Sequence, residues 1–200
     1  MLNAPKTLTI LSVAAFFAAA GCTQQTHHDA GEQVKMCCPM CETITDAVAV
    51  ISPTKGNTCA GTMHFTKETG GVHIFGQIQL SPNSVHALHV HEFGDLSSDD
   101  GSAAGGHYNP EGHHHGGPTA ADHHAGDLGN ITADASGVAQ IDLHVTGLSI
   151  CGMKDPILGR SVVIHAKIDD LTSQPAGNAG ARIGVGVIGI AKSPATTQPK

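Results

Sequence analysis

Histidines are the residues whose number and spacing point most directly to chemistry in this chain. The sequence holds 15 His among 200 residues, and imidazole is the commonest metal ligand in proteins. Two of them stand in His89-Val90-His91, within a segment that reads as a strand. Because residues two apart in a strand point to the same face, both imidazoles could bind one metal ion. Alone, this short motif is a weak signal, since most such pairs are ordinary surface histidines.

The segment that follows, from Gly94 to Asn130, shows no strand periodicity and is rich in Gly, His, Asp and Pro. A loop of this length inside a compact domain is usually functional. His165, at the end of a separate apolar strand, is a candidate ligand from a third segment. Histidine nitrogens suit copper or zinc, and an added carboxylate suits zinc. The potential ligands of the long loop are His107, His113, His114, His115, His123, His124 and Asp127.

The elements expected to position these ligands are β-strands. Turn signals such as Gly70-Gly71 and Ser136-Gly137 separate apolar or alternating segments. Roughly eight strands with many turns predict an all-β domain, built as a two-sheet sandwich or a flattened barrel. The predicted strands cover 47–51, 61–68, 72–80, 85–93, 131–134, 138–145, 161–167 and 182–191.

Several segments, taken in order, resemble the signature sequences of copper/zinc superoxide dismutases. The similarity covers about Ala47 to Ala191 and implies an eight-stranded Greek-key β-sandwich, or flattened barrel, with long metal-binding loops. The segments are His89-Val90-His91-Glu92-Phe93-Gly94-Asp95, His107-Tyr108-Asn109-Pro110, His115-Gly116-Gly117-Pro118, His124-Ala125-Gly126-Asp127-Leu128-Gly129-Asn130, Val163-Ile164-His165, Gly177-Asn178-Ala179-Gly180-Ala181-Arg182 and Gly186-Val187-Ile188-Gly189-Ile190-Ala191.

Carried over position by position, the resemblance assigns a ligand set to each metal, with His107 as the bridge between the two ions. The copper ligands fall on His89, His91, His107 and His165. The zinc ligands fall on His107, His115, His124 and Asp127. The family spacing selects His115 over its neighbours His113 and His114, and His124 over His123. These three unselected histidines are expected to be solvated loop residues, with secondary metal contacts as the alternative.

Two more positions match the family. Asp169 matches a carboxylate that links a copper histidine to a zinc histidine, and such carboxylates orient the imidazoles. Arg182 matches the arginine beside copper, a fixed cation that docks an anion, and it shares the catalytic assignment with His107. The implied reaction is dismutation of superoxide to dioxygen and hydrogen peroxide by a redox-cycling copper. A copper/zinc storage or chaperone protein on the same fold is the alternative, and the complete ligand set favours the enzyme.

The chain departs from the family in its cysteines. The two cysteines of the family's intrasubunit disulfide align with Gly101 and Val185. Loss of such a bond commonly costs ~2–5 kcal/mol, so we expect compensation elsewhere or a looser loop. Cys59 and Cys151 remain inside the domain, either paired with each other or as buried thiols.

A second departure follows Asp170. Residues 171–176 form a short segment without charged side chains, where many family members carry a longer, charged stretch. We therefore expect weaker electrostatic steering of superoxide, resting mainly on Arg182 and Lys167.

Residues 1–21 have the pattern of a lipoprotein-type signal peptide. Lys6 precedes an apolar stretch over 8–20, which is shorter than the ~20 residues of a transmembrane helix. Small residues then lead to Cys22, the expected lipidation site, and plain signal cleavage nearby is the alternative. Either route exports the domain to the periplasm or another extracytoplasmic compartment. A lipid anchor at Cys22 is the only link to a membrane that we expect.

The rest of the chain is predicted to comprise a tether over 22–43, the dismutase-like domain over 44–192 and a disordered tail over 193–200. The thiols of Cys37, Cys38 and Cys41 in the tether suit Cu(I) or zinc, with a disulfide or an inert cluster as the alternative.

Two predictions concern partners. The formal net charge of -7 argues against nucleic-acid binding, because a phosphate backbone is bound by basic surfaces. The residue types of the family's dimer contact are present near Phe93-Gly94, at Gly159 and over 187–190, so a homodimer is plausible.

Overall fold

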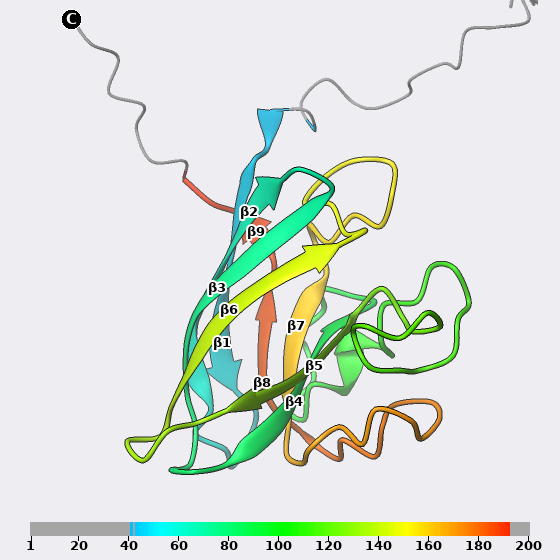
Figure 1. Cartoon of the computed structure of the whole chain (residues 1–200). Helices are drawn as coiled ribbons and strands as arrows, with labels where there is room; N and C mark the ends of the chain where they lie inside the picture. Colours follow the sequence, from blue (N-terminus) through cyan, green and yellow to red (C-terminus); the bar gives the residue numbers. More distant parts are fainter. Residues whose placement is uncertain (1–40, 42, 193–200) are drawn as a thin grey trace, which may run out of the picture. The chain divides into compact units, whose positions relative to one another are not determined.

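The computed structural model describes residue 41 and residues 43–192 (Figure 1). The expected signal peptide over 1–21, the lipidation site Cys22, the thiols of Cys37 and Cys38, and the tail over 193–200 lie outside the described residues. Within the described part of the chain, no helix has the length and apolar character needed to cross a membrane.

From residue 44 onward the regular structure is β-sheet, apart from one 3-10 turn at Ser102–Ala104. The predicted all-β class is confirmed. The strands are β1 (Asp46–Pro53), β2 (Ala60–Glu68), β3 (Gly71–Gln79), β4 (Val85–His91), β5 (Asp127–Thr132), β6 (Val138–Thr146), β7 (Ser161–His165), β8 (Arg182–Val187) and β9 (Gly189–Ile190).

The last predicted strand, over 182–191, is divided in the structure. Ile188 is fully buried between β8 and β9, and its backbone N–H donates to the Arg160 carbonyl at 2.9 Å. β8 pairs with β7 and β1, whereas β9 pairs with β1 alone. The break at Ile188 therefore lets one segment serve two parts of β1.

The strands pair antiparallel in the order β5-β4-β7-β8-β1-β2-β3-β6 and curl into a flattened barrel (Figure 1). The connections from β3 to β4 and from β6 to β7 cross between strands that are not neighbours, which is the connectivity of a Greek key. This crossing places β4 and β7 side by side, although they are far apart in the sequence.

β4 is buried on both of its faces, and this burial creates the site. Leu88 and Val90 point into the barrel core, so the alternation of a strand sends His89 and His91 to the opposite face. Both histidines are nevertheless almost fully buried. Loops must therefore cover this outer face of the barrel.

The covering loop ends earlier than the sequence predicts. We expected it to continue to Asn130, but β5 already begins at Asp127, because residues 127–132 pair with β4. His89 stands directly opposite Asp127 in that ladder. The sheet itself thus brings a carboxylate from the end of the loop next to the His89-Val90-His91 segment.

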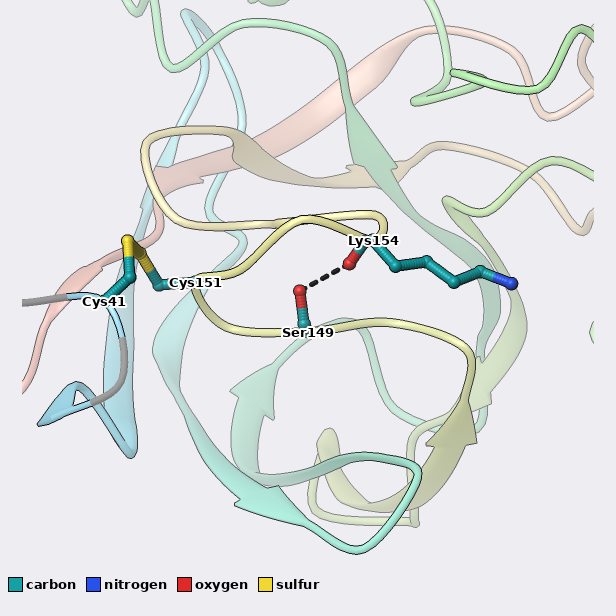
Figure 2. Close-up of a disulfide and its surroundings, with 4 residues drawn as sticks. All are labelled: Cys41, Ser149, Cys151 and Lys154. Atoms are coloured by element: carbon teal, nitrogen blue, oxygen red, sulfur yellow. Dashed lines mark hydrogen bonds between the residues drawn. A yellow bond between two sulfur atoms is a disulfide. The ribbon is translucent and has the colours of Figure 1, made fainter. Parts of the chain in front are cut away.

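The cysteine pairing differs from the Cys59–Cys151 alternative, and Cys41 follows the disulfide alternative given for the tether cluster. Cys41 forms a disulfide with Cys151 across a sequence separation of 110 residues (Figure 2). Pairing of Cys59 with Cys151 is therefore wrong. Cys59 is a free, buried thiol, and burial raises its pKa to about 12. Cys41, held in a disulfide, is not available as the thiolate metal ligand that was predicted, because a disulfide sulfur carries no charge.

Cys151 lies in the loop between β6 and β7, which is anchored on either side of it. Ile150 and Ile157 are buried in the core, and the Leu158 N–H donates to the Ile150 carbonyl at 3.0 Å. The Ser149 hydroxyl donates to the Lys154 carbonyl (Figure 2). The disulfide therefore joins the segment before β1 to a loop that the core already holds in place.

Removing this bond should destabilise the domain. We expect the Cys41→Ser/Cys151→Ser double variant to lose about 2–4 kcal/mol in its free energy of unfolding, because the reduced unfolded chain regains the entropy of a long closed loop. Denaturant unfolding of both proteins measures the difference. Wild-type protein under reducing conditions should match the variant, and equal stability of oxidised wild type and variant would contradict the assignment.

Candidate metal centre

His89 and His91 project from β4 with one ring nitrogen each already engaged. Nε2–H of His89 donates to the Asp169 carboxylate at 2.9 Å, which leaves Nδ1 free. Nδ1–H of His91 donates to the Gly105 carbonyl at 3.0 Å, which leaves Nε2 free. These hydrogen bonds select the tautomer of each ring and so determine which nitrogen can bind a metal.

His165, at the end of β7, lies next to His91 from the strand that pairs with β4. Its Nδ1–H donates to the Gly180 carbonyl at 3.1 Å, and its Nε2 lies 3.2 Å from Nε2 of His91. Together with His107, these residues form a buried group whose ligand nitrogens all lie within 4.8 Å of one another. Four imidazole nitrogens facing one point are a ligand set suited to copper.

His107 comes from the long loop, but the sheet holds its backbone. It forms an isolated antiparallel bridge with His91, and the Tyr108 N–H donates to the Val90 carbonyl at 2.8 Å. Gly126, at the end of the loop, also hydrogen-bonds Tyr108 and Val90 through its backbone. The middle and the end of the loop are thus attached to β4, and these backbone hydrogen bonds hold His107 beside the strand.

The second group gathers around Asp127. One carboxylate oxygen, Oδ1, lies 2.8 Å from Nδ1 of His107, 3.1 Å from Nδ1 of His115 and 3.3 Å from Nδ1 of His124. The other oxygen, Oδ2, accepts hydrogen bonds from the N–H groups of Gly116 and His124. Three nitrogens and one carboxylate are a tetrahedral ligand set of the kind that zinc prefers.

Asp169 lies between the two groups. Its Oδ2 accepts from His89, and its Oδ1 accepts from Nε2–H of His115 at 2.9 Å. The carboxylate is fully buried. Asn130 holds the Asp169 backbone from both sides, with its Oδ1 accepting the Asp169 N–H and its Nδ2–H donating to the Asp169 carbonyl. One carboxylate thus sets the orientation of an imidazole in each group.

The supporting contacts include residues that the sequence did not single out. Gln174 hydrogen-bonds both the N–H and the carbonyl of His115 at 2.8 Å. His86 donates through Nδ1–H to the His165 carbonyl at 2.7 Å. His86 lies in the same predicted strand, 85–93, as His89 and His91, and this position could have marked it as part of the site. No sequence signal marks the carbonyls of Gly105 and Gly180, since every residue has one.

Burial and hydrogen bonds shift the pKa values of three groups of the site. Burial, together with the nearby charge of His165, lowers the pKa of His91 to about 2. Burial, together with His89, lowers the pKa of His165 to about 3. For Asp127, burial would raise the pKa, but hydrogen bonds from His107 and from backbone N–H groups outweigh it and hold the pKa well below its usual range. Neutral imidazoles and an ionised carboxylate are the forms that bind metals.

Buried ring nitrogens without a hydrogen-bond partner occur in both groups. Such unpaired buried polar atoms are rare and costly in folded proteins, and a metal ion at each group would give every one of them a ligand bond. The residues present therefore fit a copper and a zinc ion. Within the described part of the chain, these atoms are Nδ1 of His89, Nε2 of His107, Nδ1 of His115 and Nδ1 of His124.

Arg182 reaches over the loop beside the copper-type group. Its Nη1 and Nη2 donate to the carbonyls of Gly101 and Gly105. With His91, His107 and His165, it lines an open cavity of about 530 Å³. Arg182 and the shared residue His107 therefore line the same cavity.

The missing family disulfide is replaced here by close packing. A Cβ added to Gly101 would meet Cγ1 of Val185 at 2.9 Å. Val185 also joins Ala104 and Val163 in a small apolar cluster. The loop therefore touches β8 at the two positions where the family's cysteines align, and the two Arg182 hydrogen bonds hold it there.

The other loop histidines lie outside both groups. His114 is exposed and hydrogen-bonds Asp122 at 2.9 Å. His113 is exposed and His123 is half-buried, with Nδ1–H groups that donate to the carbonyls of His123 and Ala120.

A flattened Greek-key barrel whose outer face carries two buried ligand groups with a shared histidine defines a binuclear metalloprotein. The sequence model for copper/zinc superoxide dismutase matches residues 59–188. The chain belongs to the copper/zinc superoxide dismutase family, and its cofactors are copper and zinc.

Similar proteins from a virus, a fungus and a plant are all Cu-Zn superoxide dismutases. The chain is 43% identical over 156 residues to a Cu-Zn superoxide dismutase of Paramecium bursaria Chlorella virus 1, covering 74% of this chain and 82% of the viral protein. It is 45% identical over 139 residues to one from Cryptococcus neoformans var. grubii, covering 65% and 89% of the two chains. It is 40% identical over 157 residues to Cu-Zn superoxide dismutase 2 of Mesembryanthemum crystallinum, covering 75% and 98%.

Gly177 offers a steric test of the Asp169 contacts. Its φ is +60°, and an added Cβ would fall on Oδ1 of Asp169 and close to Nε2 of His115. We expect Gly177→Ala to displace the carboxylate and to weaken metal binding by about 10–100-fold, as measured by competition with a chelator.

Gly56→Ala is the matched control for this variant. Gly56 also has a positive φ, of +81°, but an added Cβ would meet nothing within 4 Å. The control should bind metal like wild type. Equal metal affinity in Gly177→Ala and Gly56→Ala would mean that the Asp169 contacts do not orient the ligands.

Proposed function

We propose that this chain catalyses the dismutation of superoxide to dioxygen and hydrogen peroxide. In this proposal His89, His91, His107 and His165 hold copper, while His107, His115, His124 and Asp127 hold zinc. The observation that carries it is the position of His107, which belongs to both buried groups, with Nδ1 against Asp127 and Nε2 buried without a hydrogen-bond partner. A storage or chaperone protein needs no such shared ligand beside an open cavity with a fixed cation.

The two metals supply different chemistry when bound: copper accepts and returns one electron, and zinc holds a ligand without changing oxidation state. In the overall reaction, one superoxide loses an electron and leaves as dioxygen. A second superoxide gains that electron together with two protons and leaves as hydrogen peroxide.

The protein's own groups guide this reaction. Arg182 attracts the superoxide anion into the cavity and orients it there, because the Gly101 and Gly105 carbonyls hold its guanidinium in place. His107 can hold a proton at Nε2 and deliver it to the departing peroxide, while its Nδ1 side is retained near Asp127. Asp169 keeps His89 and His115 from rotating. The rate thus depends on groups that are positioned before substrate arrives.

The test is superoxide dismutation by the copper- and zinc-loaded protein, followed by rapid kinetics with metal content measured in parallel. Wild type should be fast, and Arg182→Gln should retain both metals but lose activity by about tenfold or more. His91→Ala should lose copper and activity together. Full metal loading without dismutation in wild type would instead support storage or delivery of metal.

Steering at long range should be weak. The segment 171–176 carries no charged residue, and Arg182 and Lys167 are the cations we expect to matter. We expect the rate to change by less than about threefold between about 0.01 M and about 0.15 M salt, because few charges are available to be screened. Stopped-flow rates across this range measure it, and a steep fall with salt would contradict weak steering.

Export to the periplasm or another extracytoplasmic compartment, with a lipid anchor at Cys22, is part of the proposal. It is supported by the signal pattern of residues 1–21 and by the Cys41–Cys151 disulfide, since disulfides persist in oxidising compartments. The Cys22→Ala variant should move from the membrane fraction to the soluble fraction. Unmodified Cys22 in the mass spectrum of the mature wild-type protein would rule out the anchor.

A homodimer is also proposed. Phe93, Val187 and Ile190 are exposed apolar side chains, and Gly94 lies close against Val187 and Gly159. An exposed apolar surface of this kind is typical of a protein contact. Sedimentation equilibrium should show a dimer for wild type and a monomer for Phe93→Glu. A monomeric wild type at micromolar concentration would contradict the dimer.

A further inference from the structure

A second set of histidines lies on the outer face of the barrel, on β3 and β6. Along β3, His73 and Phe75 point outward, whereas Val72 and Ile74 are buried. Along β6, Asp142 and His144 point outward in the same way. The β3–β6 ladder is paired continuously from Gly71 to Gln79, so these outward side chains stand on a rigid backbone.

The register brings three potential ligands together. His73 is directly opposite His144, and Asp142 is the outward-pointing residue of β6 that precedes His144. Nε2 of His73 lies 2.8 Å from Oδ1 of Asp142. The imidazole rings of His73 and His144 stack, with centroids 4.4 Å apart and planes 4° from parallel. One ligand atom from each of His73, Asp142 and His144 lies within 4.8 Å of the others.

Glu68 offers a fourth potential ligand, a carboxylate oxygen. Glu68, at the end of β2, places Oε2 at 3.0 Å and Oε1 at 3.2 Å from Nδ1 of His144. Two imidazoles and one or two carboxylates are a ligand set for a divalent transition metal.

We propose that His73, Asp142 and His144, with Glu68 as an additional oxygen ligand, bind a divalent transition metal ion, zinc or copper, on the outer face of the barrel. This group shares no residue with the two buried groups, which draw their ligands from β4, β5, β7 and the long loop. It also lies at the solvent-exposed surface. The site can therefore fill and empty without opening the buried centre.

His64 provides a matched control on the same face. It is exposed on β2, and its ring stacks on Phe75 with centroids 5.3 Å apart. Among the described residues it belongs to no group with metal-ligand spacing. Removing its imidazole changes the histidine count and the aromatic stack as His144 removal does, but leaves the three proposed ligands in place.

The experiment is a calorimetric titration of Zn²⁺ into full-length protein whose buried centre is already filled with copper and zinc. Wild type and His64→Gln should each bind one more equivalent of Zn²⁺ than His144→Gln, whatever other groups contribute to the total. Asp142→Asn, a change at a well-exposed side chain, should weaken that equivalent by about tenfold or more. Dismutation rates of all four proteins should be the same.

A second readout locates the ion. In NMR spectra of the imidazole rings, the signals of His73 and His144 should shift on addition of Zn²⁺, while those of His64 should not. The same number of Zn²⁺ equivalents in wild type and His144→Gln would overturn the proposal. Unmoved His73 and His144 signals at saturating Zn²⁺ would overturn it as well.

Discussion

The rest of the site depends on one buried imidazole that faces two ligand groups at once. His107 can serve both groups only if its ring is fixed within a fraction of an ångström, which a free loop does not achieve. The structure meets this demand by pairing the loop with β4 through Tyr108 in its middle and Gly126 at its end, which both hydrogen-bond the Val90 backbone. Strand geometry then extends to His107, a residue outside the named strands. Asp169 and Asp127 complete the arrangement, since each carboxylate contacts imidazoles from different segments.

The same constraint explains how the chain manages without a disulfide between the loop and the barrel. Gly101 lies against Val185, and Arg182 donates to the loop carbonyls of Gly101 and Gly105. The arginine proposed to attract the substrate therefore also holds the loop that carries His107. A covalent link occurs instead at Cys41–Cys151, where it secures the segment before β1. Local packing thus maintains the site, while the disulfide acts on the stability of the whole domain.

Much of this was readable in the sequence, for physical reasons. The two-residue period of a strand placed His89 and His91 on one face, and the ordered motifs placed the loop ligands and Asp169. The start of β5 was misjudged because Asp127-Leu128-Gly129-Asn130 lacks alternation and pairs only through its backbone with β4. The contacts of Gln174 and the Gly105 and Gly180 carbonyls depend on tertiary position and leave no pattern. The partner of Cys151 was missed because a disulfide depends on Cα separation, which the sequence does not contain.

The central claim, that His107 is shared by two metal ions, can be measured directly. Metal-free protein is given two equivalents of Cu²⁺, so that copper occupies both buried groups, and its electron paramagnetic resonance spectrum is recorded at low temperature. Two unpaired spins joined by one imidazolate couple to each other, so the account predicts a signal far weaker than that of two isolated Cu²⁺ ions. A signal with the full intensity of two independent ions would contradict it.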